Sequence, residues 1–314
     1  MKLLITGGAG FIGSEFTRLV CRGDLQPSPS KIYVLDALTY AGNIDNLNDV
    51  TGSYEFVQGN IIDTELIDQL ISEVDFVVNF AAETHVDNSI SSPMPFVQTN
   101  INGTASILNS LRRHKHVKLI QISTDEVYGT IDKGSWDESY PLLPRSPYSA
   151  SKAAADLLIG SYISTYKVRA NITRCCNNYG PYQHYEKLIP TIINCILNNK
   201  KIPIYGDGSN IREWIHVTDH CKAIWKVLTN GVDGEIYNVG TRTEFTNLQL
   251  TELILSLSGA SNALITYVQD RPGHDFRYSI NSDKVEKFLG FTPTIDLKVG
   301  LIETIEWYKN KFHA

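Results

Sequence analysis

The chain lacks the features that mark several classes of protein. No apolar run approaches the ~20 residues that a membrane span needs, so we expect no membrane partner. Basic residues are not in excess: 28 Lys and Arg stand against 34 Asp and Glu, which argues against nucleic acid as a partner. There is no internal repeat, low-complexity tract or Pro/Ser-rich linker. The 314 residues therefore predict a soluble globular protein of two lobes.

Cysteine is scarce, and its pattern offers little chemistry. The five cysteines, an odd number, contain no CxxC pair, although Cys175 and Cys176 are adjacent. Zinc is usually held by four spaced ligands, and the eight histidines are not arranged to complete such a set, so we expect no metal. No charged-then-apolar leader precedes the first apolar run. Because disulfides are rare in reducing compartments, we expect a cytoplasmic protein with structural thiols.

Short apolar runs alternate with helical periodicity through the first half of the chain. This alternation, with nearly continuous apolar strands, indicates an α/β fold, a Rossmann-like doubly wound parallel sheet. After residue 169 the pattern becomes less regular, which indicates a smaller mixed α/β lobe for substrate binding. The expected strands span 2–6, 31–36, 54–58, 76–80 and 118–123, and the expected helices span 11–21, 64–73, 95–113 and 148–166.

The helices at 95–113 and 148–166 carry small and apolar residues on more than one face, for example Ala153, Leu157 and Ile163. Such a helix usually packs against a second partner besides its own sheet. Either a homodimer interface or burial beneath later segments would supply that partner, and the sequence leaves both open.

A glycine motif follows the first strand and opens the first helix. Gly7 permits a tight turn, Gly10 lets the backbone approach a pyrophosphate, and Gly13 allows close packing of helix and strand. Asp36 ends the next strand, where a carboxylate binds ribose hydroxyls and repels a 2′-phosphate, so the expected cofactor is NAD. Asn60 and Ile61 either approach the adenine or form a simple loop. The expected cofactor contacts are Gly7, Gly10, Phe11, Ile12, Gly13, Asp36, Asn60, Ile61, Ala81, Tyr148 and Lys152.

A second stretch carries groups for redox and acid–base chemistry. Tyr148 and Lys152 are four residues apart, so they share one face of a helix. We expect the lysine ammonium and a positive nicotinamide to lower the pKa of the phenol, which then accepts a proton from a substrate alcohol. Thr124, Asp125 and Glu126 follow a strand at its carboxyl edge, and adjacent carboxylates favour one protonated acid beside one base.

With these motifs, the segment Ser123–Gly129 resembles the extended short-chain dehydrogenase/reductases, and more narrowly the nucleotide-sugar 4,6-dehydratases. The resemblance runs almost end to end; further matching segments are 38–43, 81–85, 177–182, 186–190 and 271–275. It implies a nucleoside-diphosphate hexose as substrate, first of all dTDP-glucose, and a homodimer. We expect residues 1–170 to form the NAD-binding domain, joined by parts of 215–242, and residues 171–314 to form most of the lobe.

The resemblance also implies roles for individual residues. Tyr148, with Lys152 and Thr124, takes the C4 hydroxyl proton as hydride passes to NAD. Glu126 then removes the C5 proton, and Asp125 protonates the departing C6 hydroxyl. The implied substrate contacts are His85, Thr124, Asn177, Glu186, Lys187, Leu188, Arg212, Asn247, Arg271 and His274, with Arg212 and Arg271 as cations for phosphate oxygens.

Several positions depart from the commonest family pattern, among them Asn60, Thr84, Cys176 and Glu213. None of these is one of the expected catalytic groups, but Thr84 and Cys176 border the sugar site. Dehydration of UDP-glucose, CDP-glucose or UDP-N-acetylglucosamine therefore stays open, as does 4-epimerisation. An epimerase needs only the Tyr148–Lys152 pair, so the acid pair counts against it.

Overall fold

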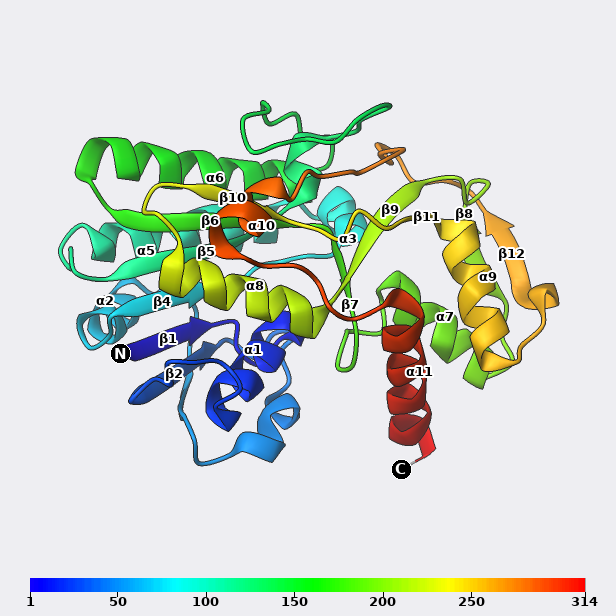
Figure 1. Cartoon of the computed structure of the whole chain (residues 1–314), viewed down its shortest axis with the longest axis horizontal. Helices are drawn as coiled ribbons and strands as arrows, with labels where there is room; N and C mark the ends of the chain where they lie inside the picture. Colours follow the sequence, from blue (N-terminus) through cyan, green and yellow to red (C-terminus); the bar gives the residue numbers. More distant parts are fainter. Residues whose placement is uncertain (314) are drawn as a thin grey trace.

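The computed structural model describes residues 1–313, with side chains described as far as residue 311. A seven-stranded sheet in the order β10-β6-β5-β4-β1-β2-β3 forms the larger part, and all of its strand pairs are parallel (Figure 1). This confirms the doubly wound parallel fold. The strands are β1 (Lys2–Thr6), β2 (Lys31–Asp36), β3 (Glu55–Gln58), β4 (Phe76–Asn79), β5 (Lys118–Thr124), β6 (Arg169–Cys175) and β10 (Ile236–Val239).

Helices cover both faces of this sheet, and each face has its own apolar core. One core joins the sheet to α1, α8 and α10, with Phe16, Ile224 and Val285 fully buried. The other joins it to α2, α5 and α6, with Ile67 and Ile107 fully buried. The helices are α1 (Phe11–Arg22), α2 (Thr64–Ser72), α3 (Val86–Ser91), α4 (Met94–Phe96), α5 (Thr104–Leu111), α6 (Pro147–Tyr166), α8 (Val217–Asn230) and α10 (Asp283–Leu289). Two 3₁₀ turns are η1 (Ile44–Val50) and η3 (Asp125–Tyr128).

The predicted elements agree with the structure to within one residue at each end, except for the helix expected over 95–113. That stretch is α4, a π-helical segment η2 (Val97–Gly103), and α5. The buried side chain of Asn100, within η2, bonds the Glu83 amide and carbonyl and also donates to the Ser151 hydroxyl. π-Segments concentrate at functional sites, and this one carries Thr99 to the cavity described below.

The smaller lobe is built from a three-stranded sheet, a two-stranded sheet and three helices around a third apolar core. Late segments return to the large sheet, since α8, β10 and α10 all pack there. The domain boundary near residue 170 stays a prediction, because β6 runs across it. The lobe elements are β7 (Asn177–Tyr179), β8 (Ile202–Tyr205), β9 (Ile211–His216), β11 (Glu244–Thr246), β12 (Ile265–Val268), η4 (Asn262–Leu264), α7 (Leu188–Leu197), α9 (Asn247–Ser258) and α11 (Leu297–His313).

The sheet order places a binding crevice between β1 and β4. From β1 the chain continues to β2 and β3 on one side, and from β4 to β5 and β6 on the other. In doubly wound sheets, ligands bind at this reversal, outside the carboxyl ends of the strands. The segments that follow β1, β4 and β5 therefore define where a site is expected. Across residues 1–313, no helix is both long and apolar enough to cross a membrane.

Candidate active site

The first strand ends in a glycine turn that packs too tightly against neighbouring backbone to admit a side chain. Gly7 has a φ of 68°, and a Cβ there would lie 2.5 Å from the backbone nitrogen of Ala81. A Cβ on Gly13 would lie 2.2 Å from the carbonyl oxygen of Gly7. Helix α1 begins at Phe11, and its N-cap residue, Gly10, supplies no side-chain cap. The first amides of α1 and its positive end are thus available to a pyrophosphate.

Asp36 lies beside this turn at the end of β2. Its carboxylate oxygens accept hydrogen bonds from the backbone amides of Ala9 (2.9 Å) and Leu38 (2.8 Å), which fix the side chain. Burial raises the pKa of Asp36, while the two amides oppose that rise. A fixed carboxyl group at this place accepts hydrogen bonds from ribose hydroxyls and disfavours a 2′-phosphate, so it fits NAD rather than NADP.

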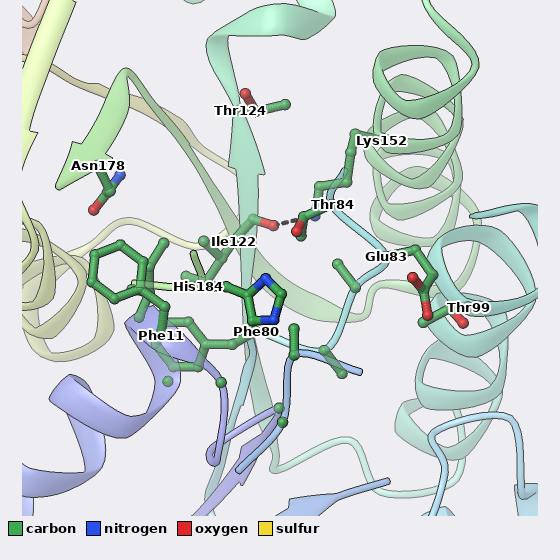
Figure 2. Close-up of a pocket in the computed structure, with 18 of the residues that line it drawn as sticks. Phe11, Phe80, Glu83, Thr84, Thr99, Ile122, Thr124, Lys152, Asn178 and His184 are labelled. Carbon is green, nitrogen blue, oxygen red and sulfur yellow. Dashed lines mark hydrogen bonds between the residues drawn. The ribbon is translucent and has the colours of Figure 1, made fainter. Parts of the chain in front are cut away.

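A cavity extends from the glycine turn past the ends of β1, β4 and β5 toward the lobe (Figure 2). It brings together the glycine turn, Asp36, the pair Tyr148–Lys152 and the pair Asp125–Glu126, which are up to 145 residues apart in the sequence. All eleven residues predicted to contact the cofactor line it, namely Gly7, Gly10, Phe11, Ile12, Gly13, Asp36, Asn60, Ile61, Ala81, Tyr148 and Lys152.

The sequence analysis missed several residues that line the same cavity. Phe80 and Glu83 follow β4, and their position at the carboxyl end of a central strand was a usable signal. Thr84, which was expected beside the sugar site, lines the cavity as well. Thr99, in the π-helical segment, and His184, in a lobe loop, had no such local signal. Figure 2 shows these side chains around the cavity together with Phe11, Ile122, Thr124, Lys152 and Asn178.

Tyr148 and Lys152, referred to below as the redox pair, stand on α6, whose start is well defined. Pro147 occupies its first turn, and Ser146 and Ser149 form a reciprocal capping box. Tyr148 and Lys152 are both buried, and the Lys152 ammonium donates to the Ile122 carbonyl at 2.6 Å (Figure 2). The helix start therefore fixes where both side chains enter the cavity.

The expected lowering of the Tyr148 pKa by Lys152 and a bound, positively charged nicotinamide stays a prediction; in the chain alone this pKa is raised. Burial raises the pKa of Tyr148 well above its usual value, and the nearby carboxylate of Glu126 raises it further. A hydrogen bond with Thr124 works in the opposite direction. Burial and a nearby carboxylate, which the local spacing does not reveal, therefore determine the direction in the chain alone.

Asp125 and Glu126 form the first turn of η3, directly after β5. The Thr124 hydroxyl donates to Asp125 (3.2 Å) and accepts from the Glu126 amide (3.3 Å). Burial, followed by the charges of Glu126 and Glu213, raises the pKa of Asp125 well above its usual range. Asp125 is therefore suited to hold a proton at neutral pH.

Glu126 has a different set of neighbours. Burial raises its pKa, but the cations of Arg271, Arg212 and Lys187 all lower it. These cations favour the ionised form, so Glu126 is the better base of the two acids.

The cavity takes in some of the expected substrate contacts and leaves others outside. Asn177, Glu186, Lys187 and Thr124 line it, and the Lys187 ammonium donates to the Thr84 carbonyl at 2.9 Å. Leu188 instead packs toward the core of the lobe. The remaining residues outside its lining are His85, Arg212, Asn247, Arg271 and His274.

Some of these outlying side chains already have local partners. His85 accepts from the Asn88 amide at the start of α3, and Asn247 begins α9. His274 bonds Asp270 (2.7 Å), and its pKa falls to about 4 because it is buried and near Arg271. His85 therefore acts in capping and His274 in local anchoring, while the cap of α9 is Thr246 rather than Asn247. A substrate role for His85, Asn247 and His274 stays a prediction.

The two arginines proposed for phosphate differ in availability. Both terminal nitrogens of Arg212 donate to backbone carbonyls, including that of Asp275 (2.8 Å), and its guanidinium stacks on Tyr278. Arg271 is 3.6 Å from Asp87, and its Nε is buried with no hydrogen-bond partner among the described residues. Arg271 is thus the cation with an open donor, while Arg212 acts on the acids through its charge.

Cys175 and Cys176 line the cavity as free, buried thiols. Burial raises the pKa of Cys175 to about 12, so it stays protonated. Within residues 1–313, no three His, Cys, Asp or Glu side chains are grouped so as to hold a metal ion.

A parallel doubly wound sheet, a glycine turn at its reversal and a buried Tyr/Lys pair define an extended short-chain dehydrogenase/reductase. Residues 4–304 match the family model for GDP-mannose 4,6 dehydratase. The dTDP-glucose 4,6-dehydratase of Streptomyces niveus is 49% identical over 313 residues, covering 99% of this chain and 93% of its own length. The chain belongs to the family of nucleotide-sugar 4,6-dehydratases.

Solved structures give the same assignment of fold. The dTDP-glucose 4,6-dehydratase DesIV of Streptomyces venezuelae, solved with NAD bound, is 47% identical with a TM-score of 0.98, covering 100% of this chain and 98% of its own. The UDP-glucose 4-epimerase of Thermotoga maritima is 27% identical with a TM-score of 0.91, covering 99% of this chain and 100% of its own. The fold is thus shared with epimerases, and the site must distinguish the two reactions.

Proposed function

We propose that this chain is a dTDP-glucose 4,6-dehydratase, which converts dTDP-glucose to dTDP-4-keto-6-deoxyglucose and water. One observation carries the proposal: Asp125 and Glu126 line the same cavity as Tyr148 and Lys152. A Tyr/Lys pair is sufficient for alcohol oxidation, but removal of water needs an acid and a base as well. An epimerase would have no task for these two acids.

Each residue of the site has one part in the reaction. Tyr148, as the phenolate, takes the proton of the C4 hydroxyl while Thr124 orients that hydroxyl. The charges of Lys152 and of an oxidised nicotinamide oppose the burial that keeps the phenol protonated. NAD, when bound, supplies the acceptor for the C4 hydride and later the donor that returns it to C6.

The elimination follows from the ketone at C4. The ketone acidifies the C5 proton, which passes to the Glu126 carboxylate. Asp125 gives its proton to the C6 hydroxyl, the C6–O bond breaks, and water leaves. When hydride has reached C6 and a proton has returned to C5, the net change is the loss of one water. The cofactor ends as it began, so it is retained rather than consumed.

The choice of dTDP-glucose among nucleotide sugars rests on similarity. Two relatives named dTDP-glucose 4,6-dehydratase are 47–49% identical over nearly the whole chain, whereas the epimerase named above is 27% identical. For the diphosphate, Arg271 offers its open Nε and Lys187 a second cation in the cavity. Dehydration of UDP-glucose or CDP-glucose is the alternative.

The proposal is tested by incubating the purified protein with dTDP-glucose, UDP-glucose and CDP-glucose in parallel and identifying the products by NMR. We expect a 4-keto-6-deoxy product from dTDP-glucose, absorbing strongly in alkali, with no net NADH. Turnover of UDP-glucose alone would reassign the substrate. Formation of a C4 epimer from any of the three nucleotide sugars would rule out the proposed dehydratase activity.

We also propose that the enzyme is a cytoplasmic homodimer. Leu157 on α6 is 65% exposed, and Leu158 and Tyr162 on the same helix are half-buried, so α6 still presents an apolar surface. The neighbouring α5 packs against it, as expected for a two-helix face that pairs with its own copy. The five free cysteines support a reducing compartment.

A further inference from the structure

A buried ion pair lies directly behind the redox pair. Asp156 follows Lys152 by one helical turn on α6, so both side chains lie on the same face of that helix. The Asp156 carboxylate accepts from Arg174 Nε on β6 at 2.9 Å, and the two side chains are 1% and 4% exposed. Neither residue lines the cavity, and the reaction proposed above assigns no task to either.

Arg174 is fixed from its other side as well. Its NH1 group donates to the Tyr128 hydroxyl (2.8 Å), which donates in turn to the Asn238 side chain on β10 (2.9 Å). The guanidinium also lies 4.8 Å from the centre of the Tyr128 ring. Arg174 therefore holds the Asp156 carboxylate at one place, because its own position is set by β6, η3 and β10.

The strand register brings two buried cations close together. Lys152 bonds the carbonyl of Ile122, and the next residue on β5, Ser123, pairs with Arg174 on β6. Burial favours a neutral lysine, because desolvation penalises the charged form. Burial does lower the pKa of Lys152, and the Asp156 carboxylate is the leading charge that opposes this.

We propose that Asp156 is a positioning residue for the redox step: held by Arg174, its carboxylate keeps the Lys152 ammonium charged next to Tyr148. A neutral lysine would no longer stabilise the phenolate that takes the C4 hydroxyl proton. Asp156 thus acts on the reaction only through Lys152. This inference rests on the proposed function, because it assigns a role within C4 oxidation.

Other titratable groups also face this pair and must be separated from it. Cys175 on β6 faces Lys152, and Cys175, Asp125 and Glu126 all face Tyr148. Overall turnover therefore mixes the titration of Lys152 with that of the two acids. Replacing Glu126 by Gln stops the reaction after C4 oxidation, so that single-turnover formation of NADH reports the redox step alone.

The test compares Glu126→Gln with Glu126→Gln/Asp156→Asn, following NADH absorbance after addition of dTDP-glucose from about pH 6 to about pH 10. The rate falls in alkali as Lys152 loses its proton. We expect Asp156→Asn to move this fall to lower pH by about one unit, and Asp156→Glu to restore it. An unshifted pH dependence with only a lower amplitude would overturn the proposal.

Matched variants keep the result interpretable. Asp156→Asn leaves Arg174 unpaired and can prevent folding, in which case Asp156→Leu/Arg174→Met replaces the whole pair, and a shift in the same direction is expected. Asp219→Asn removes another buried carboxylate, one that accepts from the Thr294 and Ile295 amides, and it should cause no shift. A folded Glu126→Gln enzyme that forms no NADH at any pH would instead count against the proposed function.

Discussion

The carboxyl groups of Asp125 and Glu126 are adjacent in the chain but have opposite electrostatic neighbours. Beyond the effect of burial, Asp125 is surrounded mainly by negative charge, from Glu126 and Glu213, whereas Glu126 is surrounded by the cations of Arg271, Arg212 and Lys187. The first arrangement favours a protonated acid and the second an ionised base. One turn of η3 thereby supplies both partners for the removal of water.

This division predicts different products from two single substitutions. Glu126→Gln should reduce turnover by roughly 10²–10⁴-fold, because the C5 proton has no acceptor, and bound NADH should accumulate. Asp125→Asn should reduce turnover similarly but should still exchange the C5 proton with deuterium from solvent, because Glu126 is intact. NMR of the recovered sugars in D₂O checks both. Equal C5 exchange in the two variants would contradict the assignment.

The raised pKa of Asp125 also predicts a dependence of stability on pH. The folded state holds this proton more tightly than the unfolded chain does. The contribution of protonated Asp125 to the free energy of unfolding is therefore fully present below the unfolded pKa of about 3.9. It is lost as pH rises toward the raised pKa of the folded state. The amide that replaces the carboxyl group in Asp125→Asn does not ionise between pH 4 and pH 8. We therefore expect it to unfold at a higher temperature than the wild type at pH 8, by an amount that shrinks toward pH 4. Exposed Asp24→Asn should show no such trend, and an equal effect of Asp125→Asn at both pH values would refute the prediction.

We expect Asp36 to set the preference for the cofactor. Asp36→Asn removes a charged acceptor for the ribose hydroxyls and the charge that repels a 2′-phosphate. We expect NAD to bind on the order of tenfold more weakly, and the preference for NAD over NADP to narrow. Calorimetry with both dinucleotides measures this, with Asp24→Asn again as control. An unchanged ratio of the two affinities would mean that another group discriminates between them.

Much of this site follows from local spacing, which the sequence displays. The glycine turn and the pair Tyr148–Lys152 each lie within a few residues, so strand and helix geometry fixes them. The raised pKa of Tyr148 in the chain alone was not predicted, because burial by distant segments decides it. The ion pair of Asp156 with Arg174 was not predicted for the same reason. Strand pairing, which has no short-range signal in the sequence, brings the two side chains together.

The proposed homodimer predicts a selective effect at α6. Leu157 and Leu143 are equally exposed, each 65%, but Leu157 lies on α6 whereas Leu143 lies in a loop. Leu157→Glu would bury a charge in the interface and should yield monomers, whereas Leu143→Glu should leave dimers intact. Light scattering after size exclusion distinguishes these states. Dimers from both variants would place the interface elsewhere.

The central claim is that one site oxidises C4, removes water and returns the same hydride to C6. The most direct measurement uses dTDP-glucose carrying deuterium at C4, with the product examined by NMR and mass spectrometry. The account predicts a 4-keto-6-deoxy sugar with that deuterium in the C6 methyl group. Deuterium still at C4, in either the starting sugar or its epimer, would contradict it.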